Sequence, residues 1–396
     1  MPATAFPPGF VWGTATAAHQ IEGGNVNNDW WDFEHMPGTL CVEPSGDACD
    51  SWHRWIEDVE LVARLGLGAY RFSVEWSRIE PDEGEWSLAT LDHYRRVCAR
   101  CHELGLTPVV TLNHFTIPRW LAARGGWEHE AAPERFARLC SRVAEHMGDL
   151  VGWACTLNEP NVVATMGYLL GVFPPALRDG GRRHAVNAQL CRAHRLGVEA
   201  LRAGRGEFPV GLTLSMHDYQ LHPGGEERLE RIRRPTEDVF LEATGGDDFV
   251  GVQCYTRMRI GPGGVMGPEE GVPTTQMGYE FWPGALEATV RRAWEVTGHV
   301  PVLVTENGIG TADDTQRVAY VAQALAGVQR CLADGIDVRG YFYWSLLDNF
   351  EWVLGYGPRF GLTEVDPVTF ERRPKPSAAW FGDVARANAL PDPVPS

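Results

Sequence analysis

The chain has 396 residues, of which 44% are hydrophobic and 22% are charged, as in an ordinary globular protein. Its net charge of −17 argues against nucleic acid and against anionic membrane surfaces as partners. Residues 1–5 have no basic start, and no stretch reaches the ~18 apolar residues of a membrane span, so we expect a cytoplasmic protein. The oligomeric state stays unknown from the sequence.

In chain order, short apolar, β-branched runs alternate with longer helix-like runs. Strands are predicted at residues 10–15, 69–75, 108–112, 152–157, 210–214, 249–255, 300–305 and 338–344. Helices are predicted at residues 52–65, 88–104, 133–146, 185–203, 226–243, 283–297, 313–333 and 375–387.

Eight strands that alternate with eight helices indicate a parallel sheet with both faces covered. The pattern therefore predicts an α/β fold, a single (β/α)8 TIM barrel that spans residues 1–396 as one catalytic domain. The rival fold is an open doubly wound sheet. That fold would need a glycine-rich turn after the first strand, which Gly13-Thr14-Ala15-Thr16 does not supply.

The nine cysteines lie mostly in apolar or helix-like runs, as Cys155 and Cys331 do, which predicts buried and reduced thiols. Cys98 and Cys101 form a CxxC pair. Because this pair lies inside a predicted helix and has no second CxxC beside it, a zinc or redox role is not favoured.

Two glutamates follow apolar strand-like runs in Thr156-Leu157-Asn158-Glu159-Pro160 and Thr305-Glu306-Asn307-Gly308. In a barrel, the carboxyl ends of the strands carry the active site, so Glu159 and Glu306 are expected to face each other there. Paired carboxylates are what a glycosidase needs: about 5 Å apart for a retaining enzyme, about 6.5–9.5 Å for an inverting one. The alternative interpretation is a structural ion-pair network around Arg71.

Other polar groups at predicted strand ends suit the same chemistry. Arg71 is a cation that can keep a nucleophilic carboxylate ionised, and Tyr255 can donate its hydroxyl to that carboxylate. The amide of Asn158 can bond a sugar hydroxyl next to the reacting carbon. One glutamate should stay protonated as the general acid, and the other should stay ionised as the nucleophile.

Sugars present apolar faces that stack on indole and hydroxyl edges that need paired donors and acceptors. Gln20, His114, Glu351 and the indole N–H of Trp352 are suitable groups. Any single tryptophan among the 15, such as Trp120, Trp127 or Trp344, is more often a core residue than a stacking platform.

A metal-dependent barrel hydrolase would need a His-x-His on the first strand, where only His19 is present, so no metal site is expected. Gly261-Pro262-Gly263-Gly264 lacks the Lys-Ser/Thr of a phosphate loop and predicts a turn or lid. No cofactor is expected.

Several blocks together resemble glycoside hydrolase family 1, the β-glucosidase family, over nearly the whole chain. They are Phe10-Val11-Trp12-Gly13-Thr14-Ala15, Asp50-Ser51-Trp52-His53-Arg54-Trp55, Tyr70-Arg71-Phe72-Ser73, the two glutamate motifs, Asn349-Phe350-Glu351-Trp352 and Arg359-Phe360-Gly361-Leu362. The resemblance implies a retaining β-glycosidase on a (β/α)8 barrel.

The same resemblance implies a role for each site residue. Glu159 matches the acid/base and Glu306 the nucleophile, with Arg71 and Tyr255 as its neighbours. The residues that match the sugar-binding groups are Gln20, His114, Asn158, Glu351 and Trp352, with Trp344 as the stacking floor.

Some positions depart from the family pattern. Gln253 stands where Asn is usual and Cys254 where Tyr is usual. Phe115-Thr116 replaces a common Trp-Asp after His114. The first departure bears on hydrogen bonding at the nucleophile, and the last on the aglycone side.

The expected function is therefore that of an exo-acting β-glucosidase, with activity on β-galactosides or β-fucosides, that cleaves small β-glycosides or short oligosaccharides by double displacement. The rivals are a transglycosylase on the same scaffold and a sugar-binding barrel without catalysis.

Overall fold

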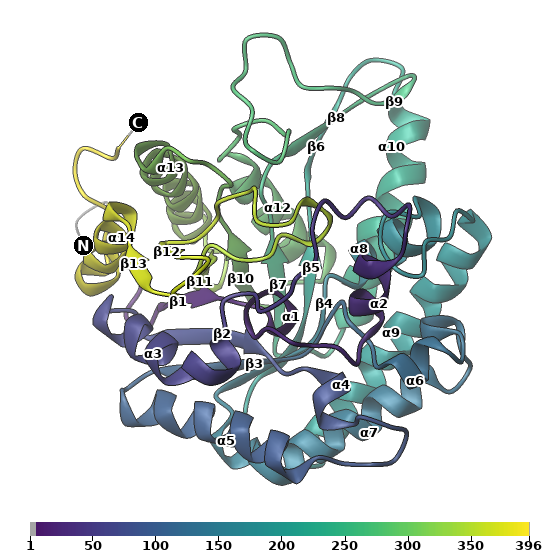
Figure 1. The fold of residues 1–396 in the computed structure, drawn as a ribbon. Helices are drawn as coiled ribbons and strands as arrows, with labels where there is room; N and C mark the ends of the chain where they lie inside the picture. The colour runs from purple at the N-terminus through teal and green to yellow at the C-terminus, as the bar shows by residue number, and fades with distance from the viewer. Residues whose placement is uncertain (1–4, 396) are drawn as a thin grey trace.

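A closed barrel of eight parallel strands forms the centre of the computed structural model, which describes residues 5–395 (Figure 1). The strand order around the barrel is β1-β11-β10-β7-β5-β4-β3-β2, which confirms the predicted (β/α)8 class. The barrel strands are β1 (Val11–Ala15), β2 (Ala69–Ser73), β3 (Thr107–His114), β4 (Trp153–Asn158), β5 (Val210–Ser215), β7 (Phe249–Gln253), β10 (Val302–Asn307) and β11 (Val338–Trp344).

The barrel strands are almost entirely buried because helices cover the outer face and side chains fill the interior. All eight predicted strands are present. The strand predicted at 249–255 ends earlier, at Gln253, so Tyr255 lies beyond the strand end. The parallel register places His114 beside Asn158 and Glu306 beside Gln253, which aligns these polar residues at the same end of the barrel.

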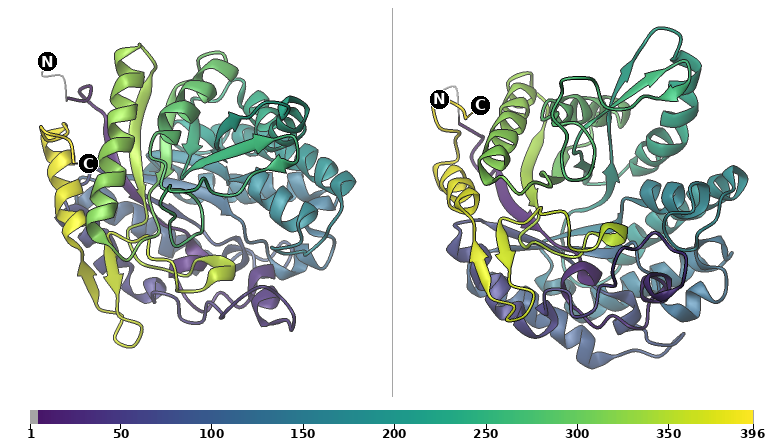
Figure 2. Two further views of the ribbon diagram at one scale, coloured as in Figure 1. Left: turned by 90° about the horizontal axis from the view of Figure 1, so that it is seen from above. Right: turned by 45° about the horizontal axis from the view of Figure 1, so that its top comes forward.

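Long helices surround the barrel (Figure 2). They are α3 (Ser51–Arg64), α5 (Leu88–Glu103), α7 (Ala132–Met147), α9 (Gly180–Arg202), α10 (Glu226–Arg233), α12 (Ala285–Val296), α13 (Asp314–Ala333) and α14 (Pro376–Ala387). Shorter helices lie in the connections: α1 (Ala18–Ile21), α2 (Asp29–His35), α4 (Trp76–Ile79), α6 (Arg119–Ala122), α8 (Pro160–Val162) and α11 (Val239–Leu241). Side-chain caps fix several starts, as where Ser87 accepts from Thr90 N ahead of α5.

The prediction of one continuous helix at residues 226–243 was wrong. A π-helical segment, Arg234–Asp238, separates α10 from α11. Pro235 in this segment has no N–H to donate to the preceding turn, so the regular hydrogen-bond ladder is interrupted there. A second π-helical segment, Val163–Leu169, follows α8.

Two small sheets, not predicted from the sequence, stand outside the barrel. One contains β6 (Asp218–Leu221), β8 (Arg257–Gly261) and β9 (Gly264–Val265), and it projects beyond the barrel rim in Figure 1. The predicted turn at Gly261-Pro262-Gly263-Gly264 connects β8 to β9. The other sheet pairs β12 (Thr363–Val365) with β13 (Arg372–Pro374).

The two ends of the described chain lie close together beside α14 (Figure 2). Phe6 N donates to Asn388 O at 2.8 Å, and Trp12 Nε1 donates to Asn388 Oδ1 at 2.9 Å. Across residues 5–395, none of the helices has the length and apolar character needed to cross a bilayer.

Candidate active site

A cavity of about 480 Å³ opens at the carboxyl ends of the barrel strands. It brings together eight of the site residues predicted from the sequence: Gln20, His114, Glu159, Tyr255, Glu306, Trp344, Glu351 and Trp352. The remaining two, Arg71 and Asn158, are buried directly behind Glu306 and bond to its neighbours.

Glu306 lies within β10 and has three donors on its carboxylate. Arg71 Nη1 and Gln253 Nε2 donate to Oε1 at 2.6 and 2.9 Å, and Tyr255 Oη donates to Oε2 at 2.6 Å. Burial raises the pKa of this carboxyl, while Arg71, Tyr255 and Gln253 act in the opposite direction and favour the ionised form. Two residues later the chain has Gly308. A side chain at this position would collide with the carbonyl oxygen of Trp344 on β11.

Glu159 stands at the tip of β4, where the chain turns into α8. Its backbone has a left-handed conformation, with φ of +44°, and its N–H donates to Thr213 O at 2.9 Å. Burial, and secondly the nearby charge of Glu306, raises the pKa of Glu159 well above its usual range. No arginine is bonded to this carboxyl in the described chain, whereas Arg71 is bonded to Glu306, so the ionised form of Glu159 is the less stabilised of the two.

Arg71 and Asn158 link β2, β4 and β10 behind the two glutamates. Besides Glu306, Arg71 donates to the Oδ1 atom of Asn158 and, through Nε, to Thr111 Oγ1 at 3.1 Å. Gln253 Nε2 also donates to Asn158 Oδ1, at 2.9 Å. A fully buried guanidinium is stable only when its donors are used in this way.

His114 is held neutral and in one tautomer. Burial, with the charge of Arg71, lowers its pKa well below the usual range. Asn158 Nδ2 lies 3.2 Å from His114 Nε2 and can only donate, so the ring proton is on Nδ1. That buried Nδ1 has no partner within the described chain.

Among the described residues, Gln20 Oε1 and Glu351 Oε2 are further buried polar atoms of the cavity lining that lack partners. Gln20 is fixed through its amide nitrogen, which donates to Asn349 Oδ1 at 3.1 Å and to Phe350 O at 2.8 Å. Burial, and secondly the charge of Glu306, raises the pKa of Glu351 to about 8, so its carboxyl can donate as well as accept at neutral pH. Unpartnered buried polar atoms that line one cavity are suited to a ligand rich in hydroxyl groups.

Aromatic rings are stacked at the same end of the cavity. The ring of His114 lies nearly parallel to Trp344 and Trp352, with centroid separations of 5.8 and 6.1 Å. Trp120 and Trp127, by contrast, are core residues. They pack against Trp76, and Trp120 Nε1 donates to Glu80 O at 2.9 Å.

The departures from the family pattern fall in different places. Phe115 lines the cavity and packs against Trp352, with centroids 4.9 Å apart. Thr116 instead bonds Glu75, at 3.0 Å, and Cys254 is buried with its thiol toward Thr256 O. Gln253 is the departure that touches Glu306.

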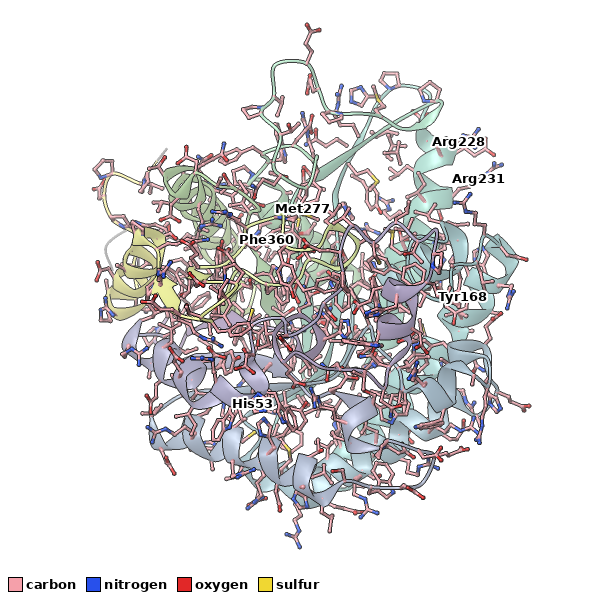
Figure 3. The ribbon with its side chains drawn as sticks, in the orientation of Figure 1. His53, Tyr168, Arg228, Arg231, Met277 and Phe360 are labelled. Carbon is pink, nitrogen blue, oxygen red and sulfur yellow. The ribbon has the colours of Figure 1, made fainter. Side chains whose placement is uncertain are left out.

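Sequence reasoning missed other residues that line the cavity. A hydrogen bond from Ser215, at the end of β5, favours the ionised form of Glu159. Tyr279 lines the cavity near Glu351. Met277 and Phe360 lie side by side over the barrel (Figure 3). Ser215 could have been predicted, because it follows a predicted strand. Met277 and Tyr279 lie in a long loop whose sequence has no hydrophobic periodicity.

Within residues 5–395, no group of three or more His, Cys, Asp and Glu side chains is arranged to hold a metal ion.

Comparison with known proteins gives a match to the family model described as "Glycosyl hydrolase family 1" at residues 3–245 and 253–390. The chain is 33% identical to "Beta-glucosidase A" of Thermotoga maritima over 441 residues, covering 98% of this chain and 99% of that protein. It is also 33% identical to the "Bifunctional beta-D-glucosidase/beta-D-fucosidase" of Bifidobacterium breve, covering 95% of this chain and 97% of that protein.

Among solved structures, the chain is similar to β-glycosidase BGL167, with a TM-score of 0.91 and 51% identity. The match covers 98% of each chain.

Proposed function

The chain belongs to glycosyl hydrolase family 1, and on that premise we propose that it is a retaining exo-β-glucosidase in which Glu306 is the nucleophile and Glu159 the general acid and base. The observation that carries the assignment of roles is the asymmetry of the two carboxyls. Glu306 receives hydrogen bonds from Arg71, Tyr255 and Gln253, whereas no cation is bonded to Glu159 within residues 5–395.

In the first step, a carboxylate oxygen of Glu306 attacks the anomeric carbon from the face opposite the leaving group. The bond from that carbon to the aglycone oxygen breaks as Glu159 transfers its proton to that oxygen. A glycosyl ester on Glu306 results, and Glu159 is left ionised. The raised pKa of Glu159 is what allows it to hold this proton at neutral pH.

In the second step, Glu159 removes a proton from water and the water oxygen attacks the anomeric carbon. The ester bond to Glu306 breaks, the sugar leaves with its β configuration, and both glutamates return to their starting states. Each proton and charge is carried by the two carboxyls, so the proposed reaction needs no cofactor.

We propose that the terminal sugar is held by Gln20, His114, Asn158, Glu351 and Trp352, and stacks on Trp344. The unpartnered atoms Gln20 Oε1, His114 Nδ1–H and Glu351 Oε2 supply acceptors and donors for adjacent hydroxyl groups. These groups can serve more than one orientation of a hydroxyl, so the proposal extends to β-fucosides and β-galactosides. The relative from Bifidobacterium breve is named for both glucosidase and fucosidase activity.

We further propose that residues 1–396 act as one catalytic domain in the cytoplasm, on small β-glycosides or short oligosaccharides. All nine cysteines are free thiols, a usage typical of a reducing compartment. Contacts between the ends of the described chain, such as Asn388 with Phe6, support a single unit.

The test is the configuration of the first product. Proton NMR during hydrolysis of methyl β-D-glucoside should show β-glucose first, followed by slow equilibration to the α anomer. Initial release of α-glucose would contradict the double-displacement proposal, because an inverting enzyme gives that anomer.

A further inference from the structure

The cavity extends well beyond the two glutamates. Its lining runs from Glu306, 4% exposed at the barrel end, to Leu170 and Val265, which are 46% and 60% exposed. A volume of about 480 Å³ is within the range of about 300–1,000 Å³ that is typical of sites for drug-sized ligands. The outer part of this cavity, between the glutamates and Leu170 and Val265, is where the leaving group of a bound glycoside would lie.

Apolar side chains from three separate elements form the wall of this outer part. The π-helical segment Val163–Leu169 provides Met166, the last turn of α10 provides Ile232, and the projecting sheet provides Met258 and Val265. Met258 on β8 pairs in register with Tyr219 on β6, so their side chains lie next to each other on one face of that sheet.

Two arginines of α10 point away from the cavity. Figure 3 shows Arg228 and Arg231 on the outer side of the helix, and Arg231 pairs with Glu227 one turn away. The neighbouring Ile232 is the residue of this turn that lines the cavity. This turn of the helix therefore presents Ile232 to the cavity, while Arg228 and Arg231 lie on the outer side.

Some polar groups of the outer wall form hydrogen bonds within the wall itself. Thr236 Oγ1 donates to Ile232 O at 2.7 Å and lies 3.2 Å from Tyr219 Oη, and Asn161 Nδ2 donates to Ser215 O at 2.8 Å. Only Asn161 Oδ1 and Thr165 Oγ1 remain as buried, unpartnered atoms of this wall among the described residues.

The cavity lining also has few charged side chains. The described lining contains no Lys, Arg or Asp, and its only Glu residues are Glu159, Glu306 and Glu351. A second sugar unit would need several paired donors and acceptors here, since a hydroxyl that loses water without a new partner weakens binding.

We propose that the outer part of the cavity selects β-glycosides with a bulky, uncharged, apolar aglycone, such as an arylalkyl alcohol, over sugar aglycones. This inference rests on the proposed β-glucosidase function. The thioethers of Met166, Met258 and Met277 are flexible and polarizable, so they adapt to flat rings of different outline. The selectivity acts on kcat/KM, because the aglycone is still in its site when the first bond breaks.

The experiment compares kcat/KM for 2-phenylethyl β-D-glucoside, methyl β-D-glucoside and cellobiose. Their leaving groups are all alkyl alcohols, so differences report on aglycone binding more than on leaving-group activation. We expect the 2-phenylethyl glucoside to exceed both others by about tenfold or more, since even one methylene in an apolar pocket is worth about tenfold.

Met166→Gln and Met258→Gln keep the side-chain length and place an amide in the outer wall. We expect each to lower the ratio of kcat/KM for the 2-phenylethyl to the methyl glucoside by about fivefold or more. Met36→Gln is the matched control, because Met36 is 51% exposed and lies outside this cavity lining. Thermal melting of each purified variant identifies any that fails to fold, and the second methionine variant then provides the test.

Two failures can be told apart. If none of the three substrates is hydrolysed, the proposed function itself is wrong. If methyl β-D-glucoside and cellobiose are hydrolysed as well as the 2-phenylethyl glucoside, or if the methionine variants keep the wild-type ratio, then only the aglycone inference is overturned.

Discussion

Arg71 Nη1 lies 2.6 Å from Glu306 Oε1, and both side chains are buried beneath the cavity. The same guanidinium also bonds Asn158, which immediately precedes Glu159 on β4. One cation therefore anchors the strand that carries Glu306 and the strand that ends at Glu159, and it is bonded directly only to the first of these carboxyls. This relationship is the physical origin of the roles proposed for the pair.

The first prediction concerns Arg71→Lys. The single nitrogen of a lysine cannot take the three positions from which Nη1, Nη2 and Nε of Arg71 donate to Glu306, Asn158 and Thr111, so the ionised form of Glu306 loses stabilisation. We expect kcat/KM for methyl β-D-glucoside to fall by about 10²–10³-fold. The hydrogen bond from Arg71 lowers the pKa of Glu306, so a lysine that keeps the charge but loses this bond should raise that pKa, and the acid limb of the pH profile should move to higher pH.

Arg372→Lys is the control for this change, since Arg372 is also buried but pairs with Asp58 away from the cavity. The acid limb of the pH profile of Arg372→Lys should stay where it is in the wild-type enzyme. An Arg71→Lys enzyme with an unmoved acid limb and normal turnover would exclude a role for Arg71 in keeping Glu306 ionised.

The second prediction concerns Glu159→Gln, which removes the proton donor but keeps the shape of the side chain. Methyl β-D-glucoside needs protonation of its leaving oxygen, so its kcat/KM should drop by about 10²–10⁴-fold. A 2,4-dinitrophenyl glucoside, whose leaving group departs without a proton, should lose far less in the first step. Equal losses for the two substrates would count against the acid role.

The pH profile gives a separate check on Glu159. Since the pKa of Glu159 is raised, the wild-type enzyme should be active through neutral pH, and on the alkaline side it should lose activity as Glu159 deprotonates. Glu159→Gln should lack this alkaline limb in its residual hydrolysis of methyl β-D-glucoside, which needs the proton. Glu230→Gln, a change at an exposed residue of α10, should keep it.

Much of the barrel follows from the sequence because its strands are short, apolar and evenly spaced between helices. The two small outer sheets could not be predicted, since β6 and β8 mix charged and apolar residues and β9 has two residues only. The break in the helix at Pro235 was present in the sequence as a proline inside a helical pattern.

The candidate site was predictable where a polar residue lies at or just beyond the end of a strand, as with Glu159, His114 and Tyr255. The outer wall of the cavity was not, because Met166, Ile232 and Met258 come from segments that meet only through the folding of long connections. The hydrogen bond from Gln253 to Glu306 required the register of β7 against β10.

The third prediction concerns Gln253→Met, which removes the amide that donates to Glu306 Oε1 and Asn158 Oδ1, each at 2.9 Å. A hydrogen bond to a charged group is worth about 1.5–3 kcal/mol, so kcat should fall by about 10–100-fold. The acid limb should shift to higher pH, because this bond lowers the pKa of Glu306. Steady-state kinetics measured across pH would show both changes. An unchanged kcat together with an unchanged acid limb would contradict the role of Gln253 in stabilising ionised Glu306.

The fourth prediction concerns stability. Arg372 Nε and Nη2 donate to the two oxygens of Asp58 at 2.8 and 3.1 Å, and this buried pair joins β13 to α3. Arg372→Met leaves a buried, unpaired carboxylate and should lower the free energy of unfolding by about 3–5 kcal/mol. Calorimetric Tm and urea denaturation measure the loss.

Two comparisons test the cause of that loss. The exposed neighbour Arg373→Met should change stability by no more than about 0.5 kcal/mol. Asp58→Leu combined with Arg372→Met should be more stable than Arg372→Met alone, because no charge is left unpaired. A double variant no more stable than the single one would assign the loss to packing instead.

The central claim, that Glu306 attacks the anomeric carbon, is tested most directly by trapping the glycosyl-enzyme. With 2-deoxy-2-fluoro-β-D-glucosyl fluoride, the activated fluoride allows the first step and the electron-withdrawing 2-fluorine slows the second, so the ester should accumulate. Digestion and tandem mass spectrometry should place one fluoroglucosyl group on Glu306. A label on Glu159 or on any other residue would contradict the account.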